Sequence, residues 1–246
     1  MKALAKKIAR RLGYEIRRTN PDATPDAFDV QRRLVAADAP LIFDVGAHVG
    51  QTAARYRELF PRAQIHCFEP SGAAFERLQA LVDGDDRTTA HRLALSDTEG
   101  AVTLHANAFD ATNSLLATDA RGAAYWGQGL LETAERVEAQ ASTVDAFCRG
   151  WGIEHIDILK LDVQGAEYLV LQGAADMLRA GAVSLVYSEI ITAPTYQGQR
   201  ALHEYMALLD SFGYRMFDLY NAVRKNMQLI QADLLFTRHT ASRATR

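Results

Sequence analysis

The chain has 246 residues, of which 48% are hydrophobic and 23% are charged, and its formal net charge at pH 7 is −3. This length and composition indicate an ordinary globular protein with one main domain. The negative net charge argues against a nucleic-acid partner, because proteins that bind the phosphate backbone usually carry a basic excess.

Residues 1–40 are expected to form a basic helix followed by a linker. Leu4, Ile8 and Leu12 recur at helical spacing, with lysines and arginines on the opposite face. Such a helix either makes weak contact with an anionic membrane surface or is a solvated helix packed on the domain. Two prolines within residues 20–25 predict the linker, and residues 241–246 are expected to be a tail.

The sequence shows neither a targeting segment nor a cysteine pattern typical of secreted proteins. The chain contains no apolar run of the length that a secretory signal or a membrane span needs, so a cytoplasmic location is expected. The only two cysteines, Cys67 and Cys148, have no disulfide or zinc spacing, which predicts reduced thiols and no zinc site.

From Leu41 onward, short apolar strands alternate with helical patterns, which indicates βαβ units and a parallel sheet. The expected strands are 41–45, 65–69, 88–94, 155–162, 183–190, 214–220 and 233–238. The expected helices are 51–59, 72–82, 142–150, 167–179 and 199–212, with Ser142 as the N-cap of the third. We therefore predict an α/β domain over 41–240, with a doubly wound, mostly parallel seven-stranded sheet and an antiparallel last strand.

The segment 95–141 does not follow the βα rhythm. Val102 and Leu104 alternate with polar residues as in a strand, and the residues after them are rich in Ala, Gly, Thr and Asn. We interpret the segment as an insertion, a hairpin followed by a mobile cover over the substrate.

A glycine-bearing turn follows the first strand and predicts a ligand site. The turn contains Asp44, Gly46, Ala47, His48 and Gly50, and it lies at the carboxyl edge of a parallel strand, where open α/β sheets bind ligands. Gly46 and Gly50 are expected to let a ligand approach the main chain closely, because neither has a Cβ.

The second strand ends in Glu69 and Pro70, which places a carboxylate where it can accept hydrogen bonds from both ribose hydroxyls of a nucleoside. The turn lacks the G-x-G-x-x-G spacing that cradles a pyrophosphate. S-adenosylmethionine has no phosphate and carries an ammonium and a sulfonium, so the Asp44 carboxylate attracts it and repels NAD. The cofactor predicted from these residues is S-adenosylmethionine.

Charged residues gather at the ends of the fourth and fifth strands. Lys160 and Asp162 lie two positions apart and share a strand face, Glu167 begins the next helix, and Glu189 ends the fifth strand. They are candidate catalytic residues, and methyl transfer to a hydroxyl needs a base for its proton. Two alternatives stay open: Lys160 and Asp162 form a buried pair, or Glu167 is a helix N-terminal residue favoured by the dipole.

His48 is a further candidate base, although its place in the turn favours main-chain contact with the ligand. Asp162 and Glu189 together could hold Mg²⁺, but carboxylate pairs at strand ends also occur without metal, and we expect no metal site.

Four stretches of the chain resemble the motifs of FkbM-type methyltransferases. They are Asp44-Val-Gly-Ala-His-Val-Gly50, Phe68-Glu-Pro70, Ala94-Leu-Ser-Asp97 and, most specifically, Leu159-Lys-Leu-Asp-Val-Gln-Gly-Ala-Glu167. The resemblance runs from about Leu41 to Phe236. It implies the class I, Rossmann-like methyltransferase sheet and O-methylation of hydroxyls on polyketides, sugars or similar metabolites, and with it we assign Ser96 to the cofactor site.

The function expected from the sequence is S-adenosylmethionine-dependent O-methylation of a small-molecule or glycan hydroxyl. A non-catalytic scaffold or sensor that binds the same cofactor is the alternative. Several carboxylates at one sheet edge argue against a scaffold, which has no use for them. Neither the acceptor nor the oligomeric state is predicted.

Overall fold

The structure, a computed structural model, describes residues 25–238. Its main sheet has the strand order β3-β2-β1-β7-β8-β10-β9. The strands are β1 (Leu41–Val45), β2 (Gln64–Phe68), β3 (Thr88–His91), β7 (Ile156–Leu161), β8 (Val183–Ile191), β9 (Tyr214–Lys225) and β10 (Gln228–Arg238). The pairs from β3 to β8 are parallel, and β10 is antiparallel to both of its neighbours. The predicted mostly parallel seven-stranded sheet with an antiparallel last strand is confirmed.

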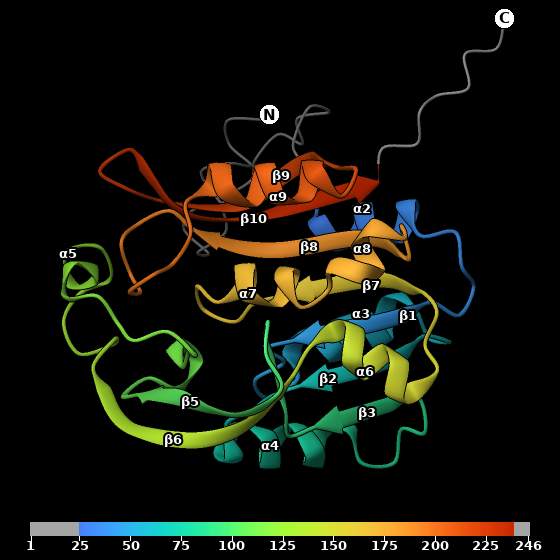
Figure 1. Cartoon of the computed structure of the whole chain (residues 1–246), viewed down its shortest axis with the longest axis horizontal. Helices are drawn as coiled ribbons and strands as arrows, with labels where there is room; N and C mark the ends of the chain where they lie inside the picture. The colour runs from blue at the N-terminus through green and yellow to red at the C-terminus, as the bar shows by residue number, and fades with distance from the viewer. Residues whose placement is uncertain (1–24, 239–246) are drawn as a thin grey trace, which may run out of the picture.

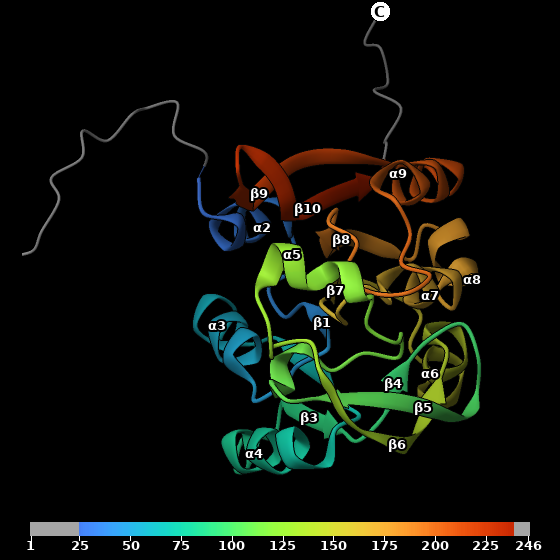
Figure 2. The ribbon, with the colours of Figure 1, turned by 90° about the vertical axis from the view of Figure 1, so that its left-hand side faces the viewer.

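Helices cover both faces of this sheet (Figures 1 and 2). One face carries α2 (Ala27–Leu34), α3 (Gln51–Leu59) and α4 (Gly72–Val82), and the other carries α6 (Val144–Trp151), α7 (Glu167–Gln172), α8 (Ala175–Arg179) and α9 (Leu202–Ser211). Successive strand side chains point to opposite faces. Ile42 and Ile158 therefore pack with α2, α3 and α4, while Phe43 and Leu159 pack in the other core.

A second, three-stranded sheet lies beside the first. It consists of β4 (Ala94–Leu95), β5 (Gly100–Asn107) and β6 (Thr133–Ser142), in the order β4-β6-β5. Residues 108–132, here named the cover segment, connect β5 to β6 and contain η1 (Asp110–Thr112), η2 (Ala120–Gly122) and α5 (Ala123–Trp126). The cover was predicted to follow a hairpin, but it lies inside one, because β6 returns to pair antiparallel with β5.

Two predicted boundaries near this sheet were wrong. The strand expected over 88–94 ends at His91, because Ala94 and Leu95 pair with β6 instead of continuing beside β2. Ser142 is the last residue of β6 and does not cap α6. The N-cap is Thr143, whose hydroxyl accepts a hydrogen bond from the amide of Ala146 at 3.0 Å.

The helix expected over 167–179 is broken into α7 and α8. The break lies at Gly173, where a Cβ would stand 2.0 Å from the carbonyl oxygen of Ser96. The loop that contains Ser96 approaches the main chain so closely that only glycine fits at this position. Helical periodicity does not reveal such a contact.

Helix α2 was not predicted. Its N-cap is Asp26, whose carboxylate accepts hydrogen bonds from the amides of Phe28 and Asp29. Asp26 after Pro25 is a helix-start signal, so the prediction of only a basic helix and a linker within residues 1–40 missed a helix that the sequence indicates. The predicted basic helix and the tail 241–246 lie outside the described residues.

Strands β9 and β10 are longer than predicted and form one hairpin. Asn226 and Met227 both have positive φ, of 49° and 65°, as a two-residue hairpin turn requires. The added length runs from 221 to 225 and from 228 to 232, where the sequence alternates weakly. In residues 25–238 no helix has both the length and the apolarity to cross a membrane.

Candidate active site

A cavity of about 380 Å³ opens at the carboxyl edge of the parallel strands. Its walls come from the ends of β1, β2 and β7, from the start of α3 and from the cover segment, which lies beside this edge in Figure 1. Seven of the site residues predicted from the sequence line it: Gly46, Ala47, His48, Glu69, Pro70, Lys160 and Asp162. Five others stand behind its walls: Asp44, Gly50, Ser96, Glu167 and Glu189.

The fold of the protein itself favours glycine at both positions of the turn. Gly46 has a φ of +74°, and a Cβ there would stand 1.8 Å from the carbonyl oxygen of Asp162. Gly50 has a φ of +91°, and a Cβ there would stand 2.5 Å from Leu81 Cδ2 on α4. The backbone of Asp162 therefore explains Gly46, and the positive φ explains Gly50, whereas the sequence suggested close approach of a ligand at both.

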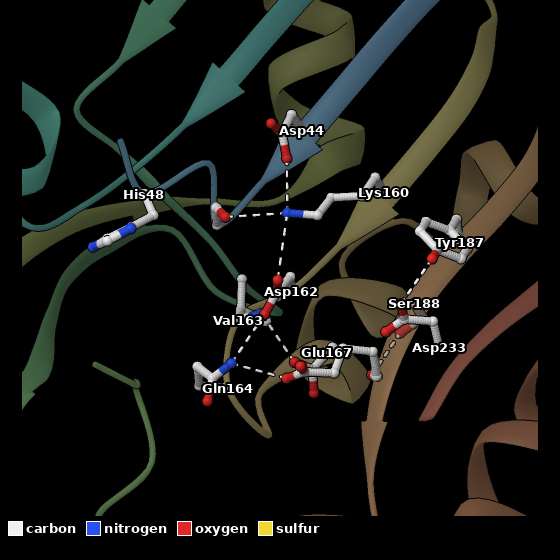
Figure 3. A network of polar contacts seen from close by, with 12 residues as sticks. Asp44, His48, Lys160, Asp162, Val163, Gln164, Glu167, Tyr187, Ser188 and Asp233 are labelled. Atoms are coloured by element: carbon white, nitrogen blue, oxygen red, sulfur yellow. Dashed lines mark hydrogen bonds and ion pairs between the residues drawn. The ribbon is translucent and has the colours of Figure 1, made fainter. Parts of the chain in front are cut away.

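Asp44 and Lys160 form a buried ion pair beneath the turn. Asp44 has no exposed surface, and its Oδ1 lies 2.8 Å from Lys160 Nζ. The ammonium also donates to the carbonyl oxygen of Gly46 at 3.2 Å and lies 3.8 Å from Asp162 Oδ2 (Figure 3). Burial alone would lower the pKa of Lys160, but the carboxylates of Asp44 and Asp162 raise it above its ordinary value. The pair fixes the end of β1 against β7.

Glu69 is buried at the end of β2 and faces the cavity. Its Oε2 accepts a hydrogen bond from the amide of His48 at 2.9 Å, and its Oε1 accepts one from the amide of Ser71 at 2.9 Å. Burial raises its pKa, and these two amides oppose the shift. Since a carboxylate oxygen has two lone pairs, each oxygen keeps capacity for a ligand hydroxyl.

Asp162 follows β7, and its side chain is 40% exposed. The amide of Gln164 donates to Asp162 Oδ1 at 3.0 Å and to Glu189 Oε2 at 2.8 Å, so one side chain holds both carboxylates (Figure 3). Gln164 has a φ of +55°, which is unusual outside glycine, and its Oε1 accepts the hydroxyl of Tyr196 at 3.1 Å. Burial, with Asp162 and Glu167 nearby, raises the pKa of Glu189 well above its ordinary value.

Glu167 does not reach the cavity but braces the turn that carries Asp162. Its Oε1 accepts hydrogen bonds from the amides of Val163 at 2.9 Å and Gly165 at 3.1 Å. Its carboxyl group is fully buried, and burial raises its pKa to about 7. Of the two sequence interpretations, the geometry matches a residue at a helix N-terminus that holds the preceding loop.

The cover segment touches the turn directly. Asp110 Oδ1 lies 3.2 Å from His48 Nε2, and the other carboxylate oxygen pairs with Arg77 on α4. The hydroxyl of Ser114 donates to the carbonyl oxygen of Gln164 at 2.8 Å. Asp110 was not singled out from the sequence, and no local pattern marks it, because its partners are 62 and 33 residues away.

Two further site assignments concern Ser96 and metal. Ser96 is buried behind the cavity, where its hydroxyl donates to Asp97 Oδ1 at 3.2 Å. Among the side chains that the structure describes, no three His, Cys, Asp or Glu residues gather as a metal ion would require.

The sequence model of the methyltransferase FkbM domain matches residues 44–216. The chain belongs to the FkbM methyltransferase family. It is therefore a methyltransferase that uses S-adenosylmethionine, and the predictions of family, enzyme class and cofactor are confirmed.

Two curated relatives are methyltransferases. The 2-O-methyltransferase NoeI of Sinorhizobium fredii is 30% identical over 181 residues, which cover 70% of this chain and 72% of NoeI. The methyltransferase sdnD of Sordaria araneosa is 28% identical over 155 residues, which cover 54% of this chain and 60% of sdnD.

Solved structures with a similar arrangement include two further methyltransferases. An rRNA methylase from Streptococcus thermophilus aligns with a TM-score of 0.49 and 13% identity, covering 86% of this chain and 93% of that one. The magnesium protoporphyrin IX methyltransferase of Synechocystis PCC 6803 aligns with a TM-score of 0.47 and 11% identity, covering 86% of this chain and 78% of that one.

Proposed function

We propose that the protein transfers the methyl group of S-adenosylmethionine to a hydroxyl of a small molecule or glycan. The name of NoeI, a 2-O-methyltransferase, describes methyl transfer to oxygen by a relative. The observation that carries the proposal is the half-exposed carboxylate of Asp162 at the edge of the cavity, where a hydroxyl proton could be accepted.

The cavity at the carboxyl edge of the sheet, here called the first cavity, suits this cofactor in size, lining and charge. Its volume of about 380 Å³ lies within the range of small-ligand pockets. Glu69 has acceptor capacity left for ribose hydroxyls, and Phe68, Leu93 and Leu95 form an apolar wall for a flat base. The charge of Lys160 is already matched by Asp44, so the carboxylates of Glu69 and Asp162 favour a cationic ligand.

In this proposal Lys160 and Glu167, two further candidates from the sequence, are positioning residues that do not touch the acceptor. Lys160 fixes the turn through Asp44 and the Gly46 carbonyl, and Glu167 fixes the loop around Asp162. The amide of Gln164 sets the orientation of the Asp162 carboxylate. When bound, S-adenosylmethionine supplies an electrophilic methyl group, and Asp162 takes the proton from the acceptor hydroxyl.

Substitution of Asp162 by asparagine tests this role. The variant keeps the size of the side chain and removes the base, so we expect kcat to fall by about 10²- to 10⁴-fold. The Kd for S-adenosylhomocysteine, measured by calorimetric titration, should change less than about threefold. The companion variant Glu69→Ala should instead raise the Kd for S-adenosylhomocysteine strongly. Unchanged turnover in Asp162→Asn would reject the assignment of Asp162 as the base.

Location and partners beyond the acceptor belong to the same proposal. The protein is cytoplasmic in this proposal and has no nucleic-acid partner, and the net charge of −3 supports the absence of such a partner. Cell fractionation with an antibody to the full chain would test the location, and recovery with the membrane pellet in low salt only would point to surface contact.

A further inference from the structure

A second, smaller cavity lies on the far side of Asp162 from the turn. Its volume is about 130 Å³, and its walls come from α2, the start of α3, the end of β7, the second half of β8 and the middle of β9 and β10. Thr52, Lys160 and Asp162 line both cavities, so the two meet at these residues. In Figure 3, Asp162 stands between His48 on one side and Tyr187 and Asp233 on the other. The proposed base therefore faces both spaces.

The polar groups of the second cavity form a connected set. Asp233 Oδ2 accepts hydrogen bonds from the hydroxyl of Tyr187 and from the amide of Asn221, both at 2.7 Å. Glu189 is held by the amides of Gln164 and Gln231. Both carboxyl groups keep free acceptor positions, because a carboxylate offers about four lone-pair sites.

Asn221 is turned toward this cavity by an irregularity in β9. Tyr220 pairs with Asp233 and Val223 pairs with Gln231, so two residues of β9 face one residue of β10. Asn221 also has a φ of +48°, which places its backbone in a rarely populated region. A bulge of this kind changes the direction of a side chain, and here it brings the amide to the wall of the cavity.

Charge and size restrict what the cavity can hold. Asp162, Glu189 and Asp233 supply carboxyl groups, and the nearby cation, Lys160, is already paired with Asp44. An anionic ligand would meet these groups without a free positive charge. The volume of about 130 Å³ is below that of pockets for drug-sized ligands, so the cavity admits a single ring and excludes a fused polycycle. Phe28 supplies an apolar wall.

We propose that the second cavity is the acceptor site and that it holds one ring of an uncharged, polyhydroxylated acceptor such as a glycoside. This inference rests on the proposed function. Neighbouring hydroxyls of the ring donate to Glu189, to Asp233 and to the side-chain oxygen of Asn221, whose amide nitrogen already donates to Asp233 and Tyr187. The reacting hydroxyl lies at Asp162. The acceptor oxygen bonds to the methyl carbon as the carbon–sulfur bond breaks, its electron pair stays on sulfur, and Asp162 takes the proton.

The test measures transfer of labelled methyl from S-adenosylmethionine to a panel of alcohols. The panel contains methyl glycosides of neutral hexoses and 6-deoxyhexoses, the matching hexose 6-phosphates, and phenolic and macrocyclic alcohols. We expect label in the neutral glycosides, with kcat/KM at least about tenfold lower for the phosphates.

Variants of the cavity wall separate binding of the acceptor from binding of the cofactor. Asp233→Asn removes a charge at constant size, and Asn221→Gly removes the amide while keeping a residue that tolerates positive φ. Each should raise the KM for the glycoside about tenfold and leave the Kd for S-adenosylhomocysteine unchanged. Asp218→Asn, on the same strand but outside both cavities, is the matched control and should leave both constants unchanged.

Three results would overturn the inference: label in none of the glycosides, equal use of the 6-phosphates, or an unchanged KM in both wall variants. If the same protein binds S-adenosylhomocysteine and labels a phenolic or macrocyclic alcohol, the inference fails while the proposed function stands. Absence of cofactor binding would reject the proposed function itself.

Discussion

The carboxyl group of Glu167 has no exposed surface, and it accepts hydrogen bonds from the main-chain amides of Val163 and Gly165 and from the hydroxyl of Tyr205. Because burial raises its pKa from 4.5 to about 7, the folded protein holds a proton between these values that the unfolded chain has released. The contribution of this group to stability is therefore complete below pH 4.5 and is lost as the pH rises through 7. Between pH 5 and pH 8 the loss amounts to about 2 kcal/mol.

Glu167→Gln should remove this pH dependence. A glutamine oxygen can still accept from the amides of Val163 and Gly165, and its amide can face Tyr205, so the loop keeps its support. We expect the free energy of unfolding of the variant, relative to that of wild type, to increase by about 2 kcal/mol from pH 5 to pH 8, because only the wild type loses stability over this range. Urea titrations at both pH values measure the difference, and parallel stability curves would show that Glu167 is charged in the folded protein.

At the scale of elements, the cover segment is held to the cofactor turn by Asp110. Its carboxylate contacts His48 and Arg77, and both contacts are partly exposed. Asp110→Asn should therefore raise the Kd for S-adenosylhomocysteine by only about fivefold, since partly exposed ion pairs contribute little to the free energy of binding. Hydrogen exchange of amides 108–118 should also become faster. Asp119→Asn breaks a pair with the exposed Arg121 in the same segment, away from the turn, and is the control. Equal effects of the two variants would contradict a specific contact at the turn.

The elements themselves could be predicted wherever local sequence determines them. β1 and β7 are short, mostly apolar strands whose residues are nearly all buried, and a glycine-bearing turn follows the first of them, so their positions and the ligand edge could be predicted. The break at Gly173 could not, because the cause is the carbonyl oxygen of Ser96, which is distant in sequence. The hairpin of β9 and β10 extends past its predicted ends because exposed strands alternate weakly.

Within the site, residue types were easier to predict than their contacts. The sequence placed Glu69 at the end of the second strand and Asp162 at the end of the fourth, on the same edge of the sheet, and both line the cavity. It did not show that Asp44 is covered by Lys160, nor that the Gln164 amide joins two carboxylates. Such contacts depend on the register between β1, β7 and β8, which periodicity alone does not supply.

At the scale of the whole molecule, the first cavity is assembled from parts that meet only in the folded chain. Its walls come from β1 and β2, from β7, and from the cover segment of the second sheet. A ligand that needs all of these walls binds only the folded state, and at 100 times its Kd it adds about 2.7 kcal/mol to the stability. For a chain of this size, the melting temperature should rise by about 5 to 10 °C.

We expect this rise with S-adenosylhomocysteine and its loss in Glu69→Ala, as measured by scanning calorimetry. NADH at the same concentration is the control, because its pyrophosphate would meet the carboxylates of Glu69, Asp110 and Asp162 around a turn without a phosphate cradle. A shift of equal size with NADH would mean that the cavity selects for adenosine alone and that the carboxylates do not discriminate by charge. A shift with S-adenosylhomocysteine alone would instead tie the choice of cofactor to the charge that surrounds the turn.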